Sequence, residues 1–166
     1  MTAKAKRIGS EEPHAIGDIS VSLWVRLLES HNLMLSELRR RFTPGRGGAA
    51  TLPRFDLLAN LIRQDGQTLA SLSRRMLVTA GNVTGLVDRA ERDGLVERRA
   101  DPGDRRLSRV FLTKKGRTLI VSLLPRHEAL VVDLLAGLEA KDRRELRRLL
   151  GKLRGSFQAP QPEAAS

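Results

Sequence analysis

Apolar residues recur along most of the chain at the period of an α-helix, in stretches separated by short polar or glycine-containing breaks. Between Ser20 and Phe42 they return every three or four positions, which is the spacing of one helix face. The same spacing predicts further helices over residues 51–64, 68–77, 79–92, 114–138 and 141–157. The chain is therefore expected to be mainly helical.

Local signals mark the ends of several predicted helices. Thr51 and Thr113 stand where an N-cap is expected, and Pro53 falls in a first turn, where its missing N–H costs nothing. Gly94 is suited to the left-handed C-cap of helix 79–92. Pro125 should kink the long helix that follows Thr113. The predicted core positions of the second and fourth helices are Leu57, Leu58, Leu61, Ile62, Val83, Leu86, Val87 and Ala90.

The short helices 68–77 and 79–92 have the arrangement of a helix-turn-helix, although a generic two-helix hairpin gives a similar pattern. The next residues favour the first interpretation. LVERR predicts a strand, ADPGD a turn and RRLSRVFLT a second strand. A helix-turn-helix followed directly by a hairpin is a winged helix. The predicted fold is mainly α with a small β-hairpin wing.

The pattern divides the chain into five parts. These are a disordered N-terminal arm (1–18), a long helix and loop (19–50), a winged helix-turn-helix lobe (51–117), a helical part (118–157) and a disordered tail (158–166).

Charge is concentrated in the predicted lobe. Of the formal net charge of +11, residues 68–117 carry +6, with 12 basic and 6 acidic residues. Arg outnumbers Lys 24 to 6, which a GC-rich genome would also produce, so the distribution is more informative than the total. A basic surface on a winged helix favours duplex DNA as the partner.

Several other classes of protein are disfavoured. The chain has no cysteine, which excludes disulfides and thiol chemistry. Its three histidines are too far apart in sequence for a local metal motif, although they could still meet in space. No metal or cofactor is expected. Five aromatic residues are too few for base-stacking platforms. We identify no secretory signal and no apolar run long enough for a membrane helix, so a cytoplasmic, nucleoid-associated protein without membrane contact is expected. No phosphate loop, nucleophile with a nearby base or supported carboxylate pair indicates an enzyme.

The outward side of residues 79–92 carries the candidate DNA contacts. Asn82 matches an adenine edge, and Arg89 matches a guanine edge or a phosphate. Two glycines would let the backbone approach DNA closely, although local tolerance also explains them, and two threonines suit phosphate oxygens. These four are Gly81, Gly85, Thr79 and Thr84.

Arginines of the predicted wing are the second group of candidates, because arginine can enter a narrow minor groove or hold phosphates. A charge run is usually a solvated face, but a preceding helix-turn-helix favours a DNA contact. The five are Arg98, Arg99, Arg105, Arg106 and Arg109. Asp88 would be repelled by DNA and is expected to pair with a wing arginine. Asp104 and Arg106 are expected to take part in the same salt bridging of the wing.

These residues also resemble a known family. LPRFDLL, LSRRMLVTAGNVTGLVDRAERDGLVERR, DPGDRR and LTKKG together are similar to the multiple-antibiotic-resistance regulator (MarR) family of bacterial transcription factors, over about residues 20–155. The resemblance implies a homodimeric winged-helix repressor whose first and last helices dimerise. It also implies a pocket for a small anionic ligand between that interface and the DNA-binding lobe. The recognition role falls on residues 79–92, and the wing-tip role on Asp104, Arg105 and Arg106.

The expected kind of ligand follows from a comparison of this sequence with the subgroups of the family. Redox-sensing members use cysteine, and zinc-sensing members use clusters that we do not identify here. Urate-responsive members are similar at Asp56, Arg98 and the LLPRH stretch, but they carry a tryptophan on an N-terminal extension helix, whereas Trp24 lies in the first long helix. LPRFDLL and NVTGLVDRAERDGLV look closer to members linked to aromatic-acid breakdown. An aromatic acid or its coenzyme A thioester is therefore the expected effector.

Candidate pocket residues are aromatic, titratable or cationic side chains near the start of the second helix, on the first helix and just after Pro125. Ordinary packing is the alternative for the histidines and the tryptophan. The set is Trp24, Arg26, His31, Arg54, Phe55, Asp56 and His127. The sequence thus predicts a ligand-responsive repressor that binds a pseudo-palindromic operator as a homodimer. An architectural DNA-binding protein without an effector is the alternative.

Overall fold

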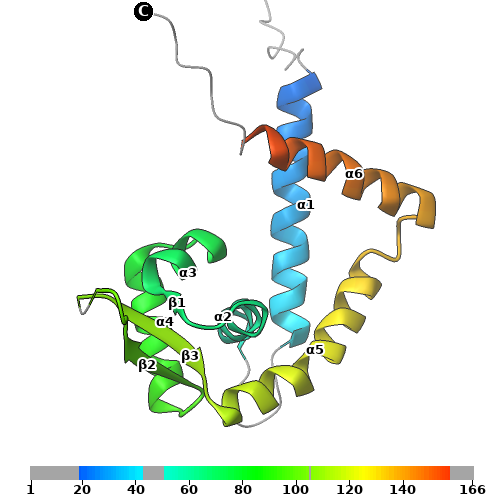
Figure 1. Ribbon diagram of the computed structural model, residues 1–166. Coiled ribbons are helices and arrows are strands. Elements are labelled where there is room, and N and C mark those ends of the chain that lie inside the picture. The colour runs from blue at the N-terminus through cyan, green and yellow to red at the C-terminus, as the bar shows by residue number, and fades with distance from the viewer. Residues whose placement is uncertain (1–18, 43–50, 105, 158–166) are drawn as a thin grey trace, which may run out of the picture. The chain divides into compact units, whose positions relative to one another are not determined.

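A computed structural model describes residues 19–42, 51–104 and 106–157 (Figure 1). The arm and tail expected at residues 1–18 and 158–166, the loop at 43–50 and Arg105 lie outside the described residues. The chain divides into two compact units, residues 1–37 and residues 38–166.

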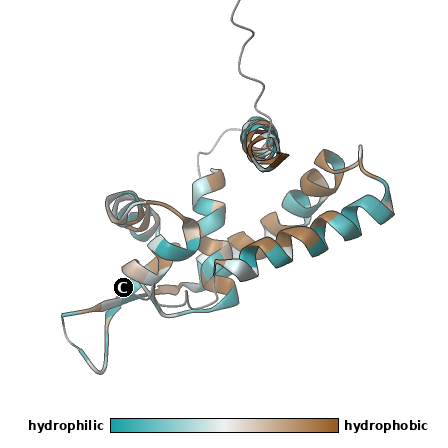
Figure 2. Cartoon of the chain, turned by 90° about the horizontal axis from the view of Figure 1, so that it is seen from above, coloured by the Kyte–Doolittle hydropathy of each residue, from teal (hydrophilic) through white to brown (hydrophobic). Residues whose placement is uncertain are grey.

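The described part of the first unit belongs to α1 (Ile19–Phe42), the predicted first helix. Several of its apolar side chains are exposed: Trp24 is 58% exposed and Leu33 is 71% exposed. Figure 2 looks nearly along α1 and shows hydrophobic and hydrophilic colours on different sides of the helix. The helix is therefore amphipathic.

The second unit contains the predicted winged helix. Its helices are α2 (Leu52–Arg63), α3 (Leu69–Met76) and α4 (Ala80–Arg92). The wing strands are β2 (Val96–Ala100) and β3 (Ser108–Leu112), and the short strand β1 (Gln67–Thr68) makes the antiparallel order β1-β3-β2. In the register, Val96 pairs with Leu112, and Gln67 pairs with Val110. The sequence did not predict β1, because a two-residue strand has no periodicity to detect.

One apolar core joins these elements. Leu57, Leu58 and Leu61 of α2 are fully buried. They pack with α3 and α4, whose Leu72, Val83 and Val87 are also fully buried. Ile62 is only half-buried, so that predicted core position is wrong. The buried side of α4 faces this core, and the opposite side is left to solvent.

Side-chain hydrogen bonds cap the N-termini of three of the helices. The hydroxyls of Thr68, Thr79 and Thr113 accept hydrogen bonds from the N–H groups of Ser71, Asn82 and Gly116. Thr51 occupies the N-cap position of α2 as predicted, but its side chain makes no capping hydrogen bond. Gly94 follows α4 with a φ of +68°, in the left-handed region expected for it.

The C-terminal helices are α5 (Lys114–Leu134) and α6 (Ala140–Ser156). α5 ends four residues before the predicted limit of 138, because the chain turns at Leu135–Leu138. Pro125 lies inside α5, and Figure 1 shows the helix changing direction along its length. A Cβ atom on Gly116 would lie 1.9 Å from the carbonyl oxygen of Leu95, so glycine lets α5 start directly against the wing. α6 contributes no buried residue.

Among the described residues, no helix is both long and apolar enough to cross a membrane. Within the same ranges, no group of three or more His, Asp or Glu residues is placed to hold a metal ion.

Candidate nucleic-acid interface

The exposed side of α4 presents most of the predicted contacts. Asn82, Thr84 and Arg89 are exposed there, as is Arg92. The Thr84 hydroxyl donates to the carbonyl of Ala80 at 3.0 Å, so its proton is already used inside the helix. The Thr79 oxygen instead accepts from the Asn82 N–H, which leaves the hydroxyl proton available to an acceptor such as a phosphate.

The two glycines of α4 differ in their surroundings. Apart from its chain neighbours and the backbone of its own helix, no described atom lies within 4 Å of a Cβ built on Gly81, so internal packing does not require glycine there. A Cβ on Gly85 would lie 3.4 Å from Nη1 of Arg89. The Arg89 side chain therefore lies back along the helix over Gly85.

Asp88 pairs with a wing arginine, as expected, and that arginine is Arg98 of β2. The same guanidinium also pairs with Glu91. In addition, the backbone N–H of Arg98 donates to the Glu91 carboxylate at 2.9 Å. Burial alone would lower the pKa of Arg98, but its bonds to Asp88 and Glu91 raise it. Arg98 was expected to contact DNA. In the structure its guanidinium joins the recognition helix to the wing.

Inside the wing, the carboxylate that organises the turn is Asp101, which is 8% exposed. It accepts hydrogen bonds from the N–H groups of Gly103 (2.7 Å) and Asp104 (3.1 Å), and it pairs with Arg109. These bonds hold the pKa of Asp101 below its usual range. Asp104 accepts a 2.9 Å hydrogen bond from the backbone N–H of Arg106. The expected wing salt bridge of Asp104 and Arg106 is therefore wrong: the ion pair is formed by Asp101 and Arg109.

The wing arginines thus have different roles. Arg109 also donates to the carbonyl of Gly66 at 2.9 Å. Arg99 pairs with Glu97, and the Arg99 guanidinium lies 4.6 Å from the centre of the Phe111 ring. Arg105 lies outside the described residues. In the part of the chain that the structure describes, the guanidinium groups of Arg89, Arg92 and Arg106 form no hydrogen bond or ion pair.

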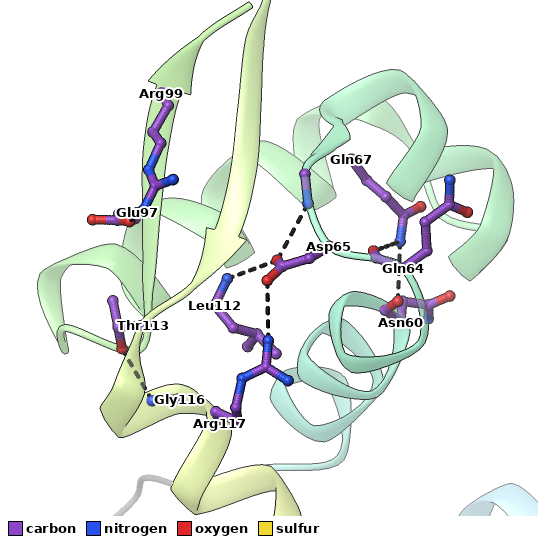
Figure 3. A network of polar contacts seen from close by, with 11 residues as sticks. Asn60, Gln64, Asp65, Gln67, Glu97, Arg99, Leu112, Thr113, Gly116 and Arg117 are labelled. Atoms are coloured by element: carbon purple, nitrogen blue, oxygen red, sulfur yellow. Dashed lines mark hydrogen bonds and ion pairs between the residues drawn. The ribbon is translucent and has the colours of Figure 1, made fainter.

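The base of the wing is joined to the helices behind it through Asp65 (Figure 3). Its carboxylate accepts from the N–H of Leu112 at 2.9 Å and from the N–H of Gly66 at 3.2 Å. It also pairs with Arg117 of α5 at 3.2 Å. Sequence reasoning missed this residue, because its partners lie 47 and 52 positions away. The contact ties α2, β3 and α5 together.

Some predicted ligand residues also come together. The rings of Phe55 and His127 are stacked with centroids 4.3 Å apart, and Phe42 meets both rings edge-on. Burial lowers the pKa of His127. Burial also raises the pKa of the neighbouring Asp56, an effect that Arg39 opposes. Arg54 pairs with Asp93 at the end of α4.

Three other predicted ligand residues belong to the first unit. Trp24 and His31 are exposed on α1, and Arg26 lines a groove of about 290 Å³ together with Ser22, Val25 and Glu29 of the same helix.

Known proteins share these features. A family model described as the MarR family matches residues 51–107, which contain α2, the helix-turn-helix and β2. The transcriptional activatory protein BadR of Rhodopseudomonas palustris is 32% identical over 120 residues, 70% of this chain and 67% of that protein. The chain belongs to the MarR family. The resemblance stated from the sequence is confirmed.

Further relatives extend the comparison. The HTH-type transcriptional regulator YkoM of Bacillus subtilis is 33% identical over 98 residues, 59% of this chain and 64% of that protein. The chain thus spans about three fifths of the length of the curated relatives that it matches, with shares of 64%, 59% and 63%. Bordetella bronchiseptica BpsR, whose DNA binding is regulated by 6-hydroxynicotinic acid, has a TM-score of 0.71 at 23% identity, over 80% of this chain and 98% of that one. At this identity the likeness shows the winged-helix fold.

Proposed function

We propose that this MarR-family chain is a ligand-responsive transcriptional regulator that binds a pseudo-palindromic duplex as a homodimer. The main support is the surface described above. Arg98 joins α4 to the wing, and Asp101 organises the turn inside the wing. These elements expose guanidinium groups with no internal partner among the described residues, at Arg89, Arg92 and Arg106. Such groups suit phosphates and base edges, with α4 in the major groove and the wing on the adjacent backbone or minor groove.

Repression relieved by a small aromatic acid or its coenzyme A thioester is part of the proposal. BpsR supports an acid effector, because 6-hydroxynicotinic acid regulates its binding to DNA. Ligand binding would favour a separation of the two recognition helices that no longer fits half-sites about 34 Å apart. In a reconstituted transcription assay, the protein should lower transcript from a promoter overlapping its site, and the effector should restore it. A rise in transcript would instead indicate an activator, the role named for BadR.

The wing contact is tested by salt titration. Selection from random duplexes should yield an inverted repeat with half-site centres about 10 base pairs apart. Arg106→Ala should weaken binding to that duplex. It should also reduce the slope of log K against log salt by about 0.9 for each phosphate that the variant no longer neutralises.

Arg99→Gln is the matched control in the same hairpin. Because Glu97 already pairs with Arg99, the control should leave the slope close to that of the wild type. If Arg106→Ala leaves both affinity and slope unchanged, the wing assignment is wrong. If no duplex is enriched, the DNA-binding function itself is wrong.

A further inference from the structure

We propose that Leu77, in the turn between α3 and the recognition helix α4, makes an apolar contact with the bound duplex. The inference rests on the proposed function, since it adds a contact to the DNA-binding surface proposed there. The groups that Leu77 would touch are the methyl group of a thymine or the carbon atoms of a deoxyribose, which are the apolar parts of a duplex. Leu77 was not among the contacts predicted from the sequence.

Leu77 combines high exposure with a strained backbone. Its side chain is 90% exposed, more than any other large apolar residue in the described ranges. Its φ of +54° and ψ of +41° lie in the left-handed region, and no other non-glycine residue in that part of the chain has a positive φ. A residue with a Cβ atom is disfavoured in this region, whereas glycine is not. Neither the exposure nor the conformation of Leu77 therefore stabilises the folded chain.

Hydrogen bonds with Ser73 hold the turn in this conformation. The carbonyl of Ser73 accepts from the backbone N–H of Leu77 and, at 3.2 Å, from that of Val78. The Ser73 hydroxyl donates to the carbonyl of Val78 at 2.6 Å. Because these bonds fix the backbone on both sides of the leucine, the direction of its Cα–Cβ bond is set before DNA is bound. Strained residues that the surrounding structure holds in place are characteristic of functional sites.

The surroundings of Leu77 favour a polyanionic partner. Every residue from Leu77 to Asn82 is exposed, so the leucine is continuous with the proposed contacts at the start of α4. Residues 66–87 contain no Asp or Glu. Arg74, in the last turn of α3, is exposed, and its guanidinium makes no hydrogen bond or ion pair within the described ranges. A duplex offers phosphates to such cations and apolar groups to the leucine, so DNA is the partner that fits.

The first measurement is duplex binding by three variants at this position. Leu77→Gly and Leu77→Asn remove the apolar group and suit the left-handed region, so both should unfold at a urea concentration no lower than that of the wild type. Both should bind the selected duplex at least about fivefold more weakly, because burial of the leucine is lost. The salt slope should not change, because no charge is removed. Leu77→Met keeps an apolar side chain and is the matched control, whose affinity should stay close to that of the wild type.

The second measurement locates the contact on the duplex. Thymines of the selected duplex are replaced one at a time by deoxyuracil, which lacks the C5-methyl group. If Leu77 contacts a thymine methyl, one replacement in each half-site should weaken binding by the wild type but not by Leu77→Gly. If Leu77 contacts a deoxyribose, each replacement should affect the two proteins equally, while Leu77→Gly stays weaker on every duplex.

The inference is overturned if folded Leu77→Gly and Leu77→Asn bind the duplex as tightly as the wild type. It is also overturned if only Leu77→Gly loses affinity, because a loosened turn would then be the cause, or if Leu77→Met loses as much affinity as Leu77→Asn. In each of these cases the wild type still binds its duplex, and the proposed function stands. A wild type that enriches no duplex contradicts the proposed function itself, and this contact with it.

Discussion

Gly81 lies in the first turn of α4, in space that a methyl group could occupy. Beyond its chain neighbours and its own helix backbone, no described atom comes within 4 Å of a Cβ built there, and no positive φ requires glycine. Glycine in a helix is less stable than alanine by up to about 1 kcal/mol. Internal packing does not account for this residue, whereas the proposed close approach of the backbone to DNA would account for it.

Replacing Gly81 separates these two explanations. Gly81→Ala should raise the free energy of unfolding by up to about 1 kcal/mol, because alanine has the higher helix propensity. It should also weaken binding to the selected duplex, because the methyl group would occupy the space of the DNA backbone. Urea denaturation and a binding titration measure the two effects. Unchanged DNA affinity in a folded, stabilised variant would mean that Gly81 is simply tolerated.

The recognition helix and the first wing strand are joined by one arginine. Arg98 pairs with Asp88 and Glu91, and both carboxylates lie on the helix that is proposed to enter DNA. The pairing neutralises acidic groups that would repel phosphates, and it sets the hairpin against α4. Arg98 is therefore a positioning residue, and its contribution to DNA binding should differ in kind from that of Arg106.

Removing this arginine should reduce stability and DNA affinity together. Arg98→Ala removes charge-assisted hydrogen bonds at a site partly screened by solvent, so the unfolding free energy is expected to fall by about 1 kcal/mol. DNA affinity should also fall while the salt slope stays near the wild-type value, because the guanidinium of Arg98 is already paired with two carboxylates of α4.

Arg98→Lys keeps the charge but not the forked geometry, and it should give intermediate stability. A salt slope reduced as much as by Arg106→Ala would show that Arg98 binds phosphate directly.

Across the chain as a whole, two helices expose apolar residues that a stable monomer would cover. On α6, Leu146, Leu149, Leu150 and Leu153 are between 40% and 48% exposed, and on α1 both Trp24 and Leu33 are more than half exposed. Apolar stripes of this extent on charged helices are typical of a protein interface. A second copy of the chain is the partner that the proposed function requires.

The mass in solution tests this dimer. Size-exclusion chromatography with light scattering should give about twice the chain mass of 18.4 kDa. Leu149→Lys combined with Leu150→Lys should shift the protein toward the monomer and weaken binding to an inverted repeat, because charges would enter the interface. Arg144→Gln, on the polar side of α6, is the control and should remain dimeric. A wild-type monomer at micromolar concentration would contradict the dimer.

The sequence alone was sufficient to predict the main helices, the wing and the family. The capping hydroxyl of Thr113, the glycine after α4 and the three-to-four spacing of apolar residues all act within a few residues, so they can be recognised from local sequence. The same reasoning missed β1 and extended α5 by four residues. A two-residue strand is defined by its neighbour in the sheet, and apolar residues of a turn resemble those of a helix.

Which arginines remain available for DNA was decided by the tertiary structure. Five wing arginines looked equivalent in sequence, yet Arg98, Arg99 and Arg109 are engaged by Asp88, Glu97 and Asp101, and Arg106 keeps its guanidinium without such a partner in the described chain. Ion pairing depends on distances of a few ångströms between side chains, and only the folded chain sets those distances.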